Sequence, residues 1–279
     1  MLHKIGIIAG AGNLPIILAH ECLKLGLLPF VIVLKGQANS GNYSELPNAV
    51  FRMGAIGSVI RRLRIEGINN LAFAGHVRKP TLLELQPDTW TAKFIARSKI
   101  FHHGDNTLLS ALIRELEKED FRIHGVNEII PDLITPPGCL TIAKPTKDNE
   151  TDIHLGIEKA SKIGRSDIGQ AVVVSKRSVI AEEDERGTDK MLCNLVGNKF
   201  AVGGVLVKII KPGQDQRVDL PTMGPTTVKN AISAKLSGIA LSAGTSLILQ
   251  KTDVITASNK AKIFLVGLKK DTVNIPLDD

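Results

Sequence analysis

The chain has 279 residues, enough for one large domain or two of ordinary size. Apolar residues make up 43% and charged residues 23%, which is the profile of a soluble globular protein. Aromatic residues make up only 4%, so no nucleic-acid partner that stacks its bases on aromatic side chains is expected. The net charge of +7 is spread along the chain, which suits an anionic substrate or an anionic membrane surface.

The cysteines and the N-terminal residues indicate the compartment. Cys22, Cys139 and Cys193 lack the spacing of a metal site, and unpaired cysteines predict a reducing environment. The first residues, MLHKIGIIAGAG, do not resemble a signal peptide, and no apolar run reaches the length of a membrane span. We therefore expect a cytoplasmic protein that touches a membrane only from its surface.

The first half of the chain alternates strand and helix patterns. Buried strands are expected at 4–9, 29–34, 49–53, 70–74 and 122–126, and helices from the turn at 10–12 to residue 24, at 56–66 and at 104–119. Such alternation predicts a parallel sheet covered by helices. We expect a Rossmann-like N-terminal domain over residues 1–132.

The second half has a different pattern. Residues 131–150 contain four prolines and no periodicity, which predicts a linker at 133–150. A mixed α/β C-terminal domain is expected at 151–279. Its elements are a helix at 151–163, a hairpin of strands 170–175 and 178–182, a helix at 187–197, a strand at 202–208, a loop at 211–221, a helix from 225, and further strands and helices at 239–242, 252–261 and 263–267. The fold class is α/β.

The turn Gly10-Ala11-Gly12 joins the first strand to the first helix. Glycine allows a close backbone approach to a ligand, and the free amides at a helix start attract phosphate. The dinucleotide fingerprint GxGxxG is incomplete, because Pro15 takes the last glycine position, and Lys35 ends the second strand in place of an acid. This disfavours a nicotinamide dehydrogenase. It leaves a phosphate contact and a purely structural turn as the two interpretations.

The loop Gly75–Pro80 follows the fourth expected strand. Ligands of open parallel sheets bind at the carboxyl ends of strands, so this loop should lie near the Gly10 turn. Arg78 and Lys79 could then meet phosphate oxygens, or they could simply face solvent. The adjacent His102 and His103 have no third ligand at a familiar spacing, so no zinc site is expected.

Carboxylates gather at turns and helix starts of the second half. Asp167, Glu183, Asp189 and Asp219 could converge on a hard divalent cation, which prefers oxygen ligands. Taken singly, each is more often a helix cap or a solvated acid. The residue pattern alone leaves both interpretations open.

Six segments, in order along nearly the whole chain, resemble one family. They are IAGAGNLP at 8–15, FAGHVRKP at 73–80, HGDNTLL at 103–109, GRSDIGQAVVV at 164–174, EDERGTD at 183–189 and RVDLPTMG at 217–224. The family is the UDP-2,3-diacylglucosamine pyrophosphatase of the lipid A pathway (LpxI type), found in many bacteria that lack the metallophosphoesterase version. The chain departs from the family pattern at His76 and in GDN at 104–106, where a GDD-type sequence is usual.

The resemblance implies an enzyme and its site residues. It implies a Mg²⁺-dependent hydrolase that converts UDP-2,3-diacylglucosamine to UMP and 2,3-diacylglucosamine 1-phosphate (lipid X). Asp219 of the RVDLPT motif would be catalytic and also a metal ligand, together with Asp167, Glu183 and Asp189. The residues implied to contact the substrate are Gly12, Asn13, Leu14, Pro15, Gly75, His76, Gly104, Asp105, Arg217 and Thr222.

The expected partners follow from that substrate. The resemblance implies a homodimer, and the lipid substrate implies peripheral contact with the cytoplasmic face of the inner membrane. The alternative function is a non-catalytic module that binds or carries a nucleotide-linked lipid. Metal-dependent turnover would distinguish the enzyme from the carrier.

Overall fold

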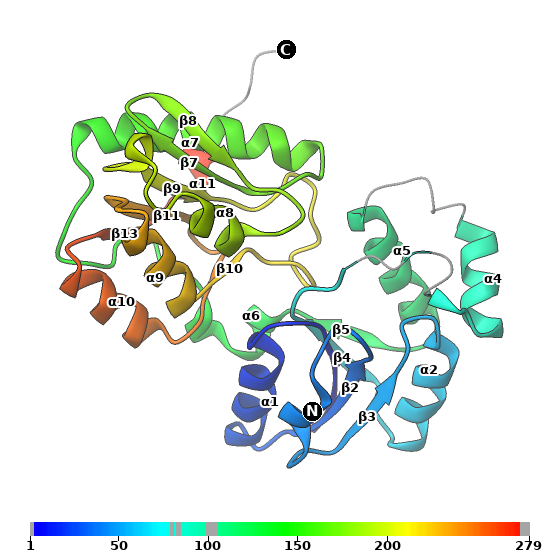
Figure 1. Cartoon of the computed structure of the whole chain (residues 1–279). Coiled ribbons are helices and arrows are strands. Elements are labelled where there is room, and N and C mark those ends of the chain that lie inside the picture. The colour runs from blue at the N-terminus through cyan, green and yellow to red at the C-terminus, as the bar shows by residue number, and fades with distance from the viewer. Residues whose placement is uncertain (1–2, 79–80, 82–84, 99–104, 274–279) are drawn as a thin grey trace. The chain divides into compact units, whose positions relative to one another are not determined.

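The computed structural model describes residues 3–78, 81, 85–98 and 105–273, and the chain divides into two compact units (Figure 1). Unit 1 comprises Met1–Pro131 together with Asp215–Asp219. Unit 2 comprises Asp132–Gln214 and Leu220–Asp279. A short segment of the second half of the chain therefore belongs to the unit that the first half builds.

Unit 1 contains a five-stranded parallel sheet in the order β3-β2-β1-β4-β5. Its strands are β1 (Lys4–Ala9), β2 (Leu28–Leu34), β3 (Asn48–Phe51), β4 (Asn70–Ala74) and β5 (Arg122–His124). The run VIVL within β2 is almost fully buried, as expected for a strand covered on both faces. This is the strand order of a doubly wound dinucleotide-binding fold, which confirms the expected Rossmann-like sheet.

Helices cover both faces of this sheet, as Figure 1 shows for α1 and α2. They are α1 (Leu14–Lys24), α2 (Ile56–Ile65), α4 (Thr89–Ser98), α5 (Asp105–Lys118) and the short α6 (Val126–Ile129), with 3-10 turns η1 (Ser40–Tyr43) and η3 (Pro131–Leu133). Apolar side chains of α2 and α5, among them Leu63 and Ile113, pack on Ile32, Leu71 and Ile123 of the sheet.

The helix α4 was not expected from the sequence. The carboxylate of Asp88, just before it, accepts from the amide of Thr91 at 2.9 Å and from the amide of Ser58 in α2 at 3.0 Å. Burial raises the pKa of Asp88, but these hydrogen bonds outweigh it and the pKa lies below its usual value. One carboxylate therefore caps two helix starts, and this long-range partner has no local sequence signal.

Unit 2 contains a mixed six-stranded sheet in the order β6-β13-β11-β9-β7-β8 and a two-stranded sheet β10-β12. The strands are β6 (Gly138–Cys139), β7 (Ala171–Ser175), β8 (Ser178–Glu182), β9 (Val205–Lys208), β10 (Thr222–Met223), β11 (Gly238–Ser242), β12 (Leu247–Ile248) and β13 (Phe264–Leu268). Strands β9, β11 and β13 run parallel, whereas β6 and β7 pair antiparallel with them. The expected mixed α/β fold is confirmed.

Three layers make up unit 2. The helices are α7 (Lys147–Arg165), α8 (Thr188–Asn194), the 3-10 turn η4 (Lys199–Ala201), α9 (Pro225–Ser233), α10 (Lys251–Lys260) and α11 (Lys270–Val273). Ile157 of α7 packs on Val172 and Val207 of one sheet face, and Val228 of α9 packs with Val173 on the other. Successive strand residues thus point to opposite helix layers.

The expected linker region holds secondary structure. Residues 133–150 contain β6 and the first turn of α7, and they belong to unit 2. Thr146 begins α7 with a capping box, because its hydroxyl accepts from the amide of Asn149 while the Asn149 side chain accepts from the Thr146 amide. The prolines at 131–145 therefore lie in an irregular but structured stretch.

The β7–β8 hairpin confirms the expected antiparallel pair. Its turn residues, Lys176 and Arg177, both have a left-handed backbone, with φ of 51° and 61°. The buried carboxylate of Asp152 in α7 accepts from both turn amides, at 3.1 Å and 2.7 Å. This tertiary contact replaces the Asn-Gly sequence that such a turn usually needs.

We predict that Asp152→Ala lowers the free energy of unfolding by about 2 kcal/mol, because the two turn amides lose a charged acceptor. The double substitution Lys176→Asn/Arg177→Gly should restore about half of that loss, since Asn-Gly favours this turn by itself. Urea unfolding followed by circular dichroism measures both. A loss below about 0.5 kcal/mol for Asp152→Ala would contradict the role of this carboxylate.

Candidate functional site at the carboxyl edge of the first sheet

The strand order of unit 1 reverses at β1, which lies between β2 and β4. Ligands of open α/β sheets bind outside the carboxyl ends of the strands at such a reversal. The loops that follow β1 and β4 meet there: the Ala11 amide donates to the His76 carbonyl at 2.7 Å, and the His76 amide donates to the Ala11 carbonyl at 3.1 Å. The two loops singled out by sequence therefore do lie side by side.

Two glycines permit this close approach. A Cβ on Gly10 would lie 2.5 Å from the carbonyl oxygen of His76, and a Cβ on Gly75 would lie 2.5 Å from that of Ala11. Gly12 differs, because its φ is +91° and a Cβ there would meet no atom within 4 Å. Close packing thus explains why glycine stands at positions 10 and 75, whereas Gly12 borders open space.

The start of α1 next to Gly12 has the features of an anion site. Asn13 is the N-cap residue but makes no side-chain capping bond, and no acidic residue lies in the first turn. The first amides of a helix without a side-chain cap attract negative charge. Leu14 and Pro15 are buried and anchor this turn in the core, with Pro15 against Gly75.

Gln37 contacts the loops that follow β3 and β4 and itself follows β2. The sequence did not indicate this role. Its side-chain oxygen accepts from the Arg78 amide at 2.9 Å, and its nitrogen donates to the Arg78 carbonyl at 3.3 Å. The same nitrogen contacts the Met53 sulfur at 3.3 Å. Gln37, Met53 and Arg78 follow β2, β3 and β4, so the Arg78 backbone is fixed at the edge where His76 lies.

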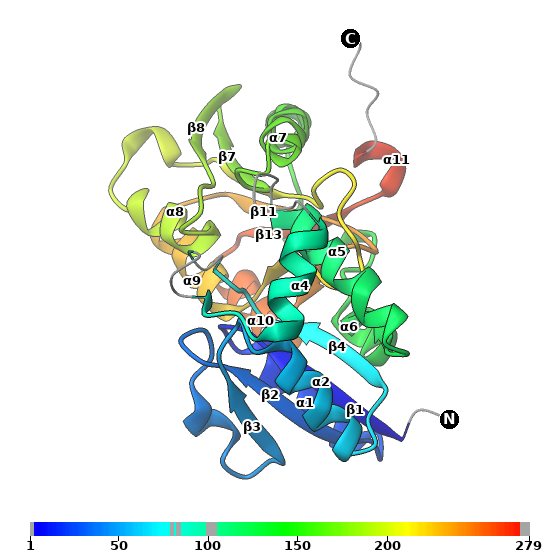
Figure 2. The same cartoon turned by 90° about the vertical axis from the view of Figure 1, so that its right-hand side faces the viewer.

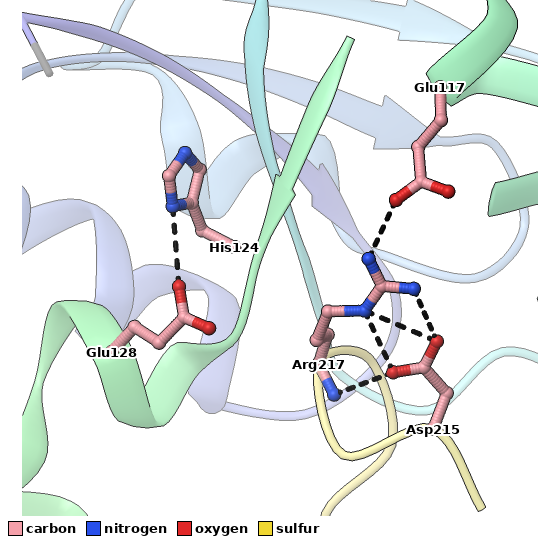
Figure 3. A network of polar contacts seen from close by, with 5 residues as sticks. All are labelled: Glu117, His124, Glu128, Asp215 and Arg217. Atoms are coloured by element: carbon pink, nitrogen blue, oxygen red, sulfur yellow. Dashed lines mark hydrogen bonds and ion pairs between the residues drawn. The ribbon is translucent and has the colours of Figure 1, made fainter. Parts of the chain in front are cut away.

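The segment Asp215–Asp219 reaches this edge from the second half of the chain. Arg217 holds it in place: Nη2 donates to Asp215 at 2.8 Å, and Nη1 donates to Glu117 of α5 at 2.6 Å (Figure 3). The backbone of Arg217 lies against Gly125, directly after β5, and Val218 packs on the apolar core of unit 1. Sequence gave no signal for Glu117.

One cation, Arg217, contacts two carboxylates, those of Asp215 and Glu117. Hydrogen bonds from Arg217 hold the pKa of Asp215 below its usual value, and Asp215 and Glu117 raise the pKa of Arg217. Asp219 is half-buried, and its amide donates to the Asp215 carbonyl at 3.2 Å. The fork of Arg217 thus fixes the backbone turn from which Asp219 projects. In the same view, His124 contacts Glu128 at 3.4 Å (Figure 3).

Thr222 lies three residues after Asp219, in β10 of unit 2. Its carbonyl accepts from the ammonium of Lys208 at 3.1 Å, and that ammonium also donates to the Thr188 hydroxyl at 2.9 Å. Thr188 in turn donates to Glu183 at 2.5 Å. All three of Lys208, Thr188 and Glu183 are buried, so this chain of hydrogen bonds replaces water around two buried charges.

The carboxylates expected to bind metal do not form a cage within unit 2. Asp167 forms an ion pair with Lys211 at 2.7 Å, and Glu183 accepts from Thr188 and from the Gln170 amide. Asp189 has one oxygen that is buried without a hydrogen-bond partner. Across the residues that the structure describes, no three His, Cys, Asp or Glu side chains are grouped to hold an ion. A preformed carboxylate site does not fit this arrangement.

Gly104 and Asp105 are two further residues that the resemblance implies to contact the substrate. Gly104 lies outside the described residues. Asp105 is the first residue of α5, which agrees with the expectation of a helix start there. No helix in the described part of the chain is both long and apolar enough to cross a membrane.

Comparison with known proteins shows the family. A model described as the LpxI N-terminal domain matches residues 4–133, and one described as the LpxI C-terminal domain matches residues 136–266. The chain belongs to the LpxI family. A relative from Caulobacter vibrioides, named UDP-2,3-diacylglucosamine pyrophosphatase LpxI, is 35% identical over 275 residues, which are 96% of this chain and 98% of the relative.

Solved structures resemble the chain only distantly. CobK precorrin-6A reductase is 10% identical, with a TM-score of 0.35 over 99% of this chain and 91% of that one. The biotin carboxylase domain of Hydrogenobacter thermophilus 2-oxoglutarate carboxylase is 10% identical, with a TM-score of 0.26 over 64% of this chain and 36% of that one. Similarity at this level carries no argument about the LpxI family.

In this LpxI family chain, Gly12→Ala should weaken binding of inorganic pyrophosphate about tenfold, because a methyl group would enter the open space beside α1; this equals roughly 1.4 kcal/mol. Gly26→Ala is the matched control, since Gly26 has a φ of +73° and also borders open space. Both variants should lose about 1 kcal/mol of stability to backbone strain. Calorimetry measures the affinity, and equal weakening by both variants would contradict a ligand contact at Gly12.

The lowered pKa of Asp215 predicts a pH dependence. A carboxyl with a lowered folded pKa stabilises the fold above its unfolded pKa of about 4 and loses that contribution as pH falls through the folded value. Arg217→Gln should therefore destabilise unit 1 at neutral pH, and its difference from the native protein should shrink below about pH 4. Urea unfolding at several pH values measures this difference.

The matched control is Arg186→Gln. Arg186 makes the same two-residue fork with Asp184, where its Nη2 lies 2.5 Å from the carboxylate, but that fork is exposed and no third side chain among the described residues hydrogen-bonds to it. Solvent screens such a pair, so its removal should change stability little at any pH. Equal effects from the two substitutions would mean that Arg217 adds nothing beyond a surface ion pair.

Proposed function

We propose that this chain is a hydrolase that cleaves the pyrophosphate bond of UDP-2,3-diacylglucosamine. The relative that carries this name aligns over nearly its whole length. The structural observation that supports the proposal is the meeting of two features at one sheet edge. The uncapped start of α1 suits a diphosphate, and the segment that bears Asp219 docks at the carboxyl end of the same sheet.

The diphosphate would lie against the amides at Gly12 and Asn13. These amides lie at a helix start that has no acidic side chain to compete with phosphate. His76 and Arg78 are exposed on the neighbouring loop, whose backbone Ala11 and Gln37 hold in place. The loop is therefore rigid where it would contact phosphate oxygens, which favours orientation of the substrate.

Asp219 is the group that we assign to the reaction. Hydrolysis of a diphosphate needs a water molecule that loses its proton as it attacks phosphorus, and a positioned carboxylate can accept that proton. The same carboxylate could instead hold a cation beside the phosphates. Its half-buried position, on a turn fixed by Arg217, suits either role.

We also propose that the reaction depends on Mg²⁺. The described carboxylates of unit 2 do not form a site by themselves, but Mg²⁺ commonly binds one or two carboxylates together with substrate phosphates. When bound in this way, the ion would neutralise the diphosphate and make its phosphorus easier to attack. The ligand that we assign to the ion is Asp219, because its segment docks at the sheet edge where the diphosphate would lie.

The products that we propose are UMP and 2,3-diacylglucosamine 1-phosphate. Purified protein should release UMP from UDP-2,3-diacylglucosamine with Mg²⁺ and should stop doing so with excess EDTA. Tight binding of the substrate without UMP release would overturn the proposal in favour of a non-catalytic carrier.

We predict that Asp219→Asn lowers the rate of UMP release by at least about a hundredfold, the usual loss for a general base. Asp120→Asn is the matched control: Asp120 is exposed in the same unit, and Asn tolerates its left-handed backbone. The residual rate measured against Mg²⁺ concentration separates the two roles, because loss of a ligand raises the Mg²⁺ requirement. Substantial activity in Asp219→Asn would remove this residue from the reaction.

A further inference from the structure

An exposed apolar loop lies in unit 2, between α8 and β9. Phe200 is 77% exposed, Val196 is 56% exposed and Val202 is 46% exposed, and all three lie within seven residues of one another. Large apolar side chains grouped in this way on a surface usually mark a binding surface.

Cations surround this loop. The backbone oxygen of Val202 accepts from the hydroxyl of Ser175, which directly precedes the exposed hairpin turn Lys176-Arg177. Figure 2 shows the two strands of this hairpin, β7 and β8, side by side. The amide of Gly203 donates to the carbonyl of Lys235 at 2.9 Å, and Lys199 lies within the loop itself. These contacts bring the hairpin turn, the loop 196–202 and Lys235 together; we call them the basic apolar surface.

Negative charge is missing from the segments that build this surface. The sequence has no Asp or Glu in residues 171–181, 190–214 or 220–252. Asp152, which contacts the hairpin turn, is buried and accepts from the two turn amides. In the described part of the chain, none of Lys176, Arg177, Lys199 and Lys235 forms an ion pair, so their charges remain available to a partner.

Another exposed apolar residue beside cations shows the contrast. Ile65 on α2 of unit 1 is 80% exposed, but its neighbours Arg62 and Arg64 pair with Glu66 and Glu119, both at 2.8 Å. The cations there are already neutralised within the protein. Apolar side chains together with unpaired cations are thus a feature of the surface in unit 2.

We propose that the basic apolar surface docks unit 2 on an anionic lipid bilayer. Lys and Arg side chains near such a bilayer are attracted to its headgroups, and Phe and Val side chains enter the interface below them. The inference rests on the proposed function, because a diacylated substrate resides in a membrane. A second copy of the chain fits less well, since a two-fold interface would place these cations against one another.

Sedimentation with lipid vesicles tests the proposal. The full-length protein should sediment with vesicles of phosphatidylcholine and phosphatidylglycerol, and far less with vesicles of phosphatidylcholine alone. Lys176→Gln/Arg177→Gln and Phe200→Ser should each weaken binding to the anionic vesicles about tenfold. The matched controls in unit 1, Arg61→Gln/Arg122→Gln and Ile65→Ser, should leave it within about twofold, because these residues are not part of the basic apolar surface.

Hydrolysis of substrate dispersed in detergent separates this proposal from the proposed function. The surface variants should keep their turnover in detergent, since none of these residues lies in unit 1. Equal loss of vesicle binding in the unit 1 controls would overturn the docking surface in favour of nonspecific attraction.

Light scattering provides a second check: a dimer that the native protein forms and that Phe200→Ser abolishes would make the surface a subunit interface and overturn the proposal.

Discussion

The contacts that Arg217 makes are the interaction on which the proposed site depends. Arg217 lies in the second half of the chain, yet its guanidinium donates to Glu117 of α5 and to Asp215, and its backbone lies against Gly125. Five residues thereby become part of unit 1, while the chain on either side belongs to unit 2. Because Asp219 is the last of these five, the same contact determines at which sheet the proposed catalytic carboxylate lies.

The carboxyl edge of the first sheet owes its form to close backbone packing. Gly10 and Gly75 let two loops pair where a methyl group would collide with a carbonyl oxygen, whereas Gly12 leaves space beside a helix start. One short stretch thus contains glycines with different purposes. The distinction decides which substitutions should damage folding and which should damage binding.

Unit 2 has two groups of charged side chains, one buried and one exposed. Lys208 and Glu183 are buried and linked through Thr188, which supports the backbone at Thr222 shortly after Asp219. The exposed cations at the hairpin turn and the loop 196–202 have no acidic neighbours in sequence over long stretches. The buried charges therefore serve the fold, and the exposed ones are free to attract an anionic surface.

The sequence by itself determined the parallel sheet, the hairpin and the pairing of the Gly10 and Gly75 loops, because burial periodicity and strand-end turns are local signals. Its motifs also pointed to the family. Only the tertiary structure decided that Asp215–Asp219 joins unit 1, that Asp88 also caps the start of α2, and that Glu183 binds Thr188 rather than lying in a carboxylate cage. These outcomes depend on partners 30 to 100 residues away or on the packing of a buried charge, which no local pattern records.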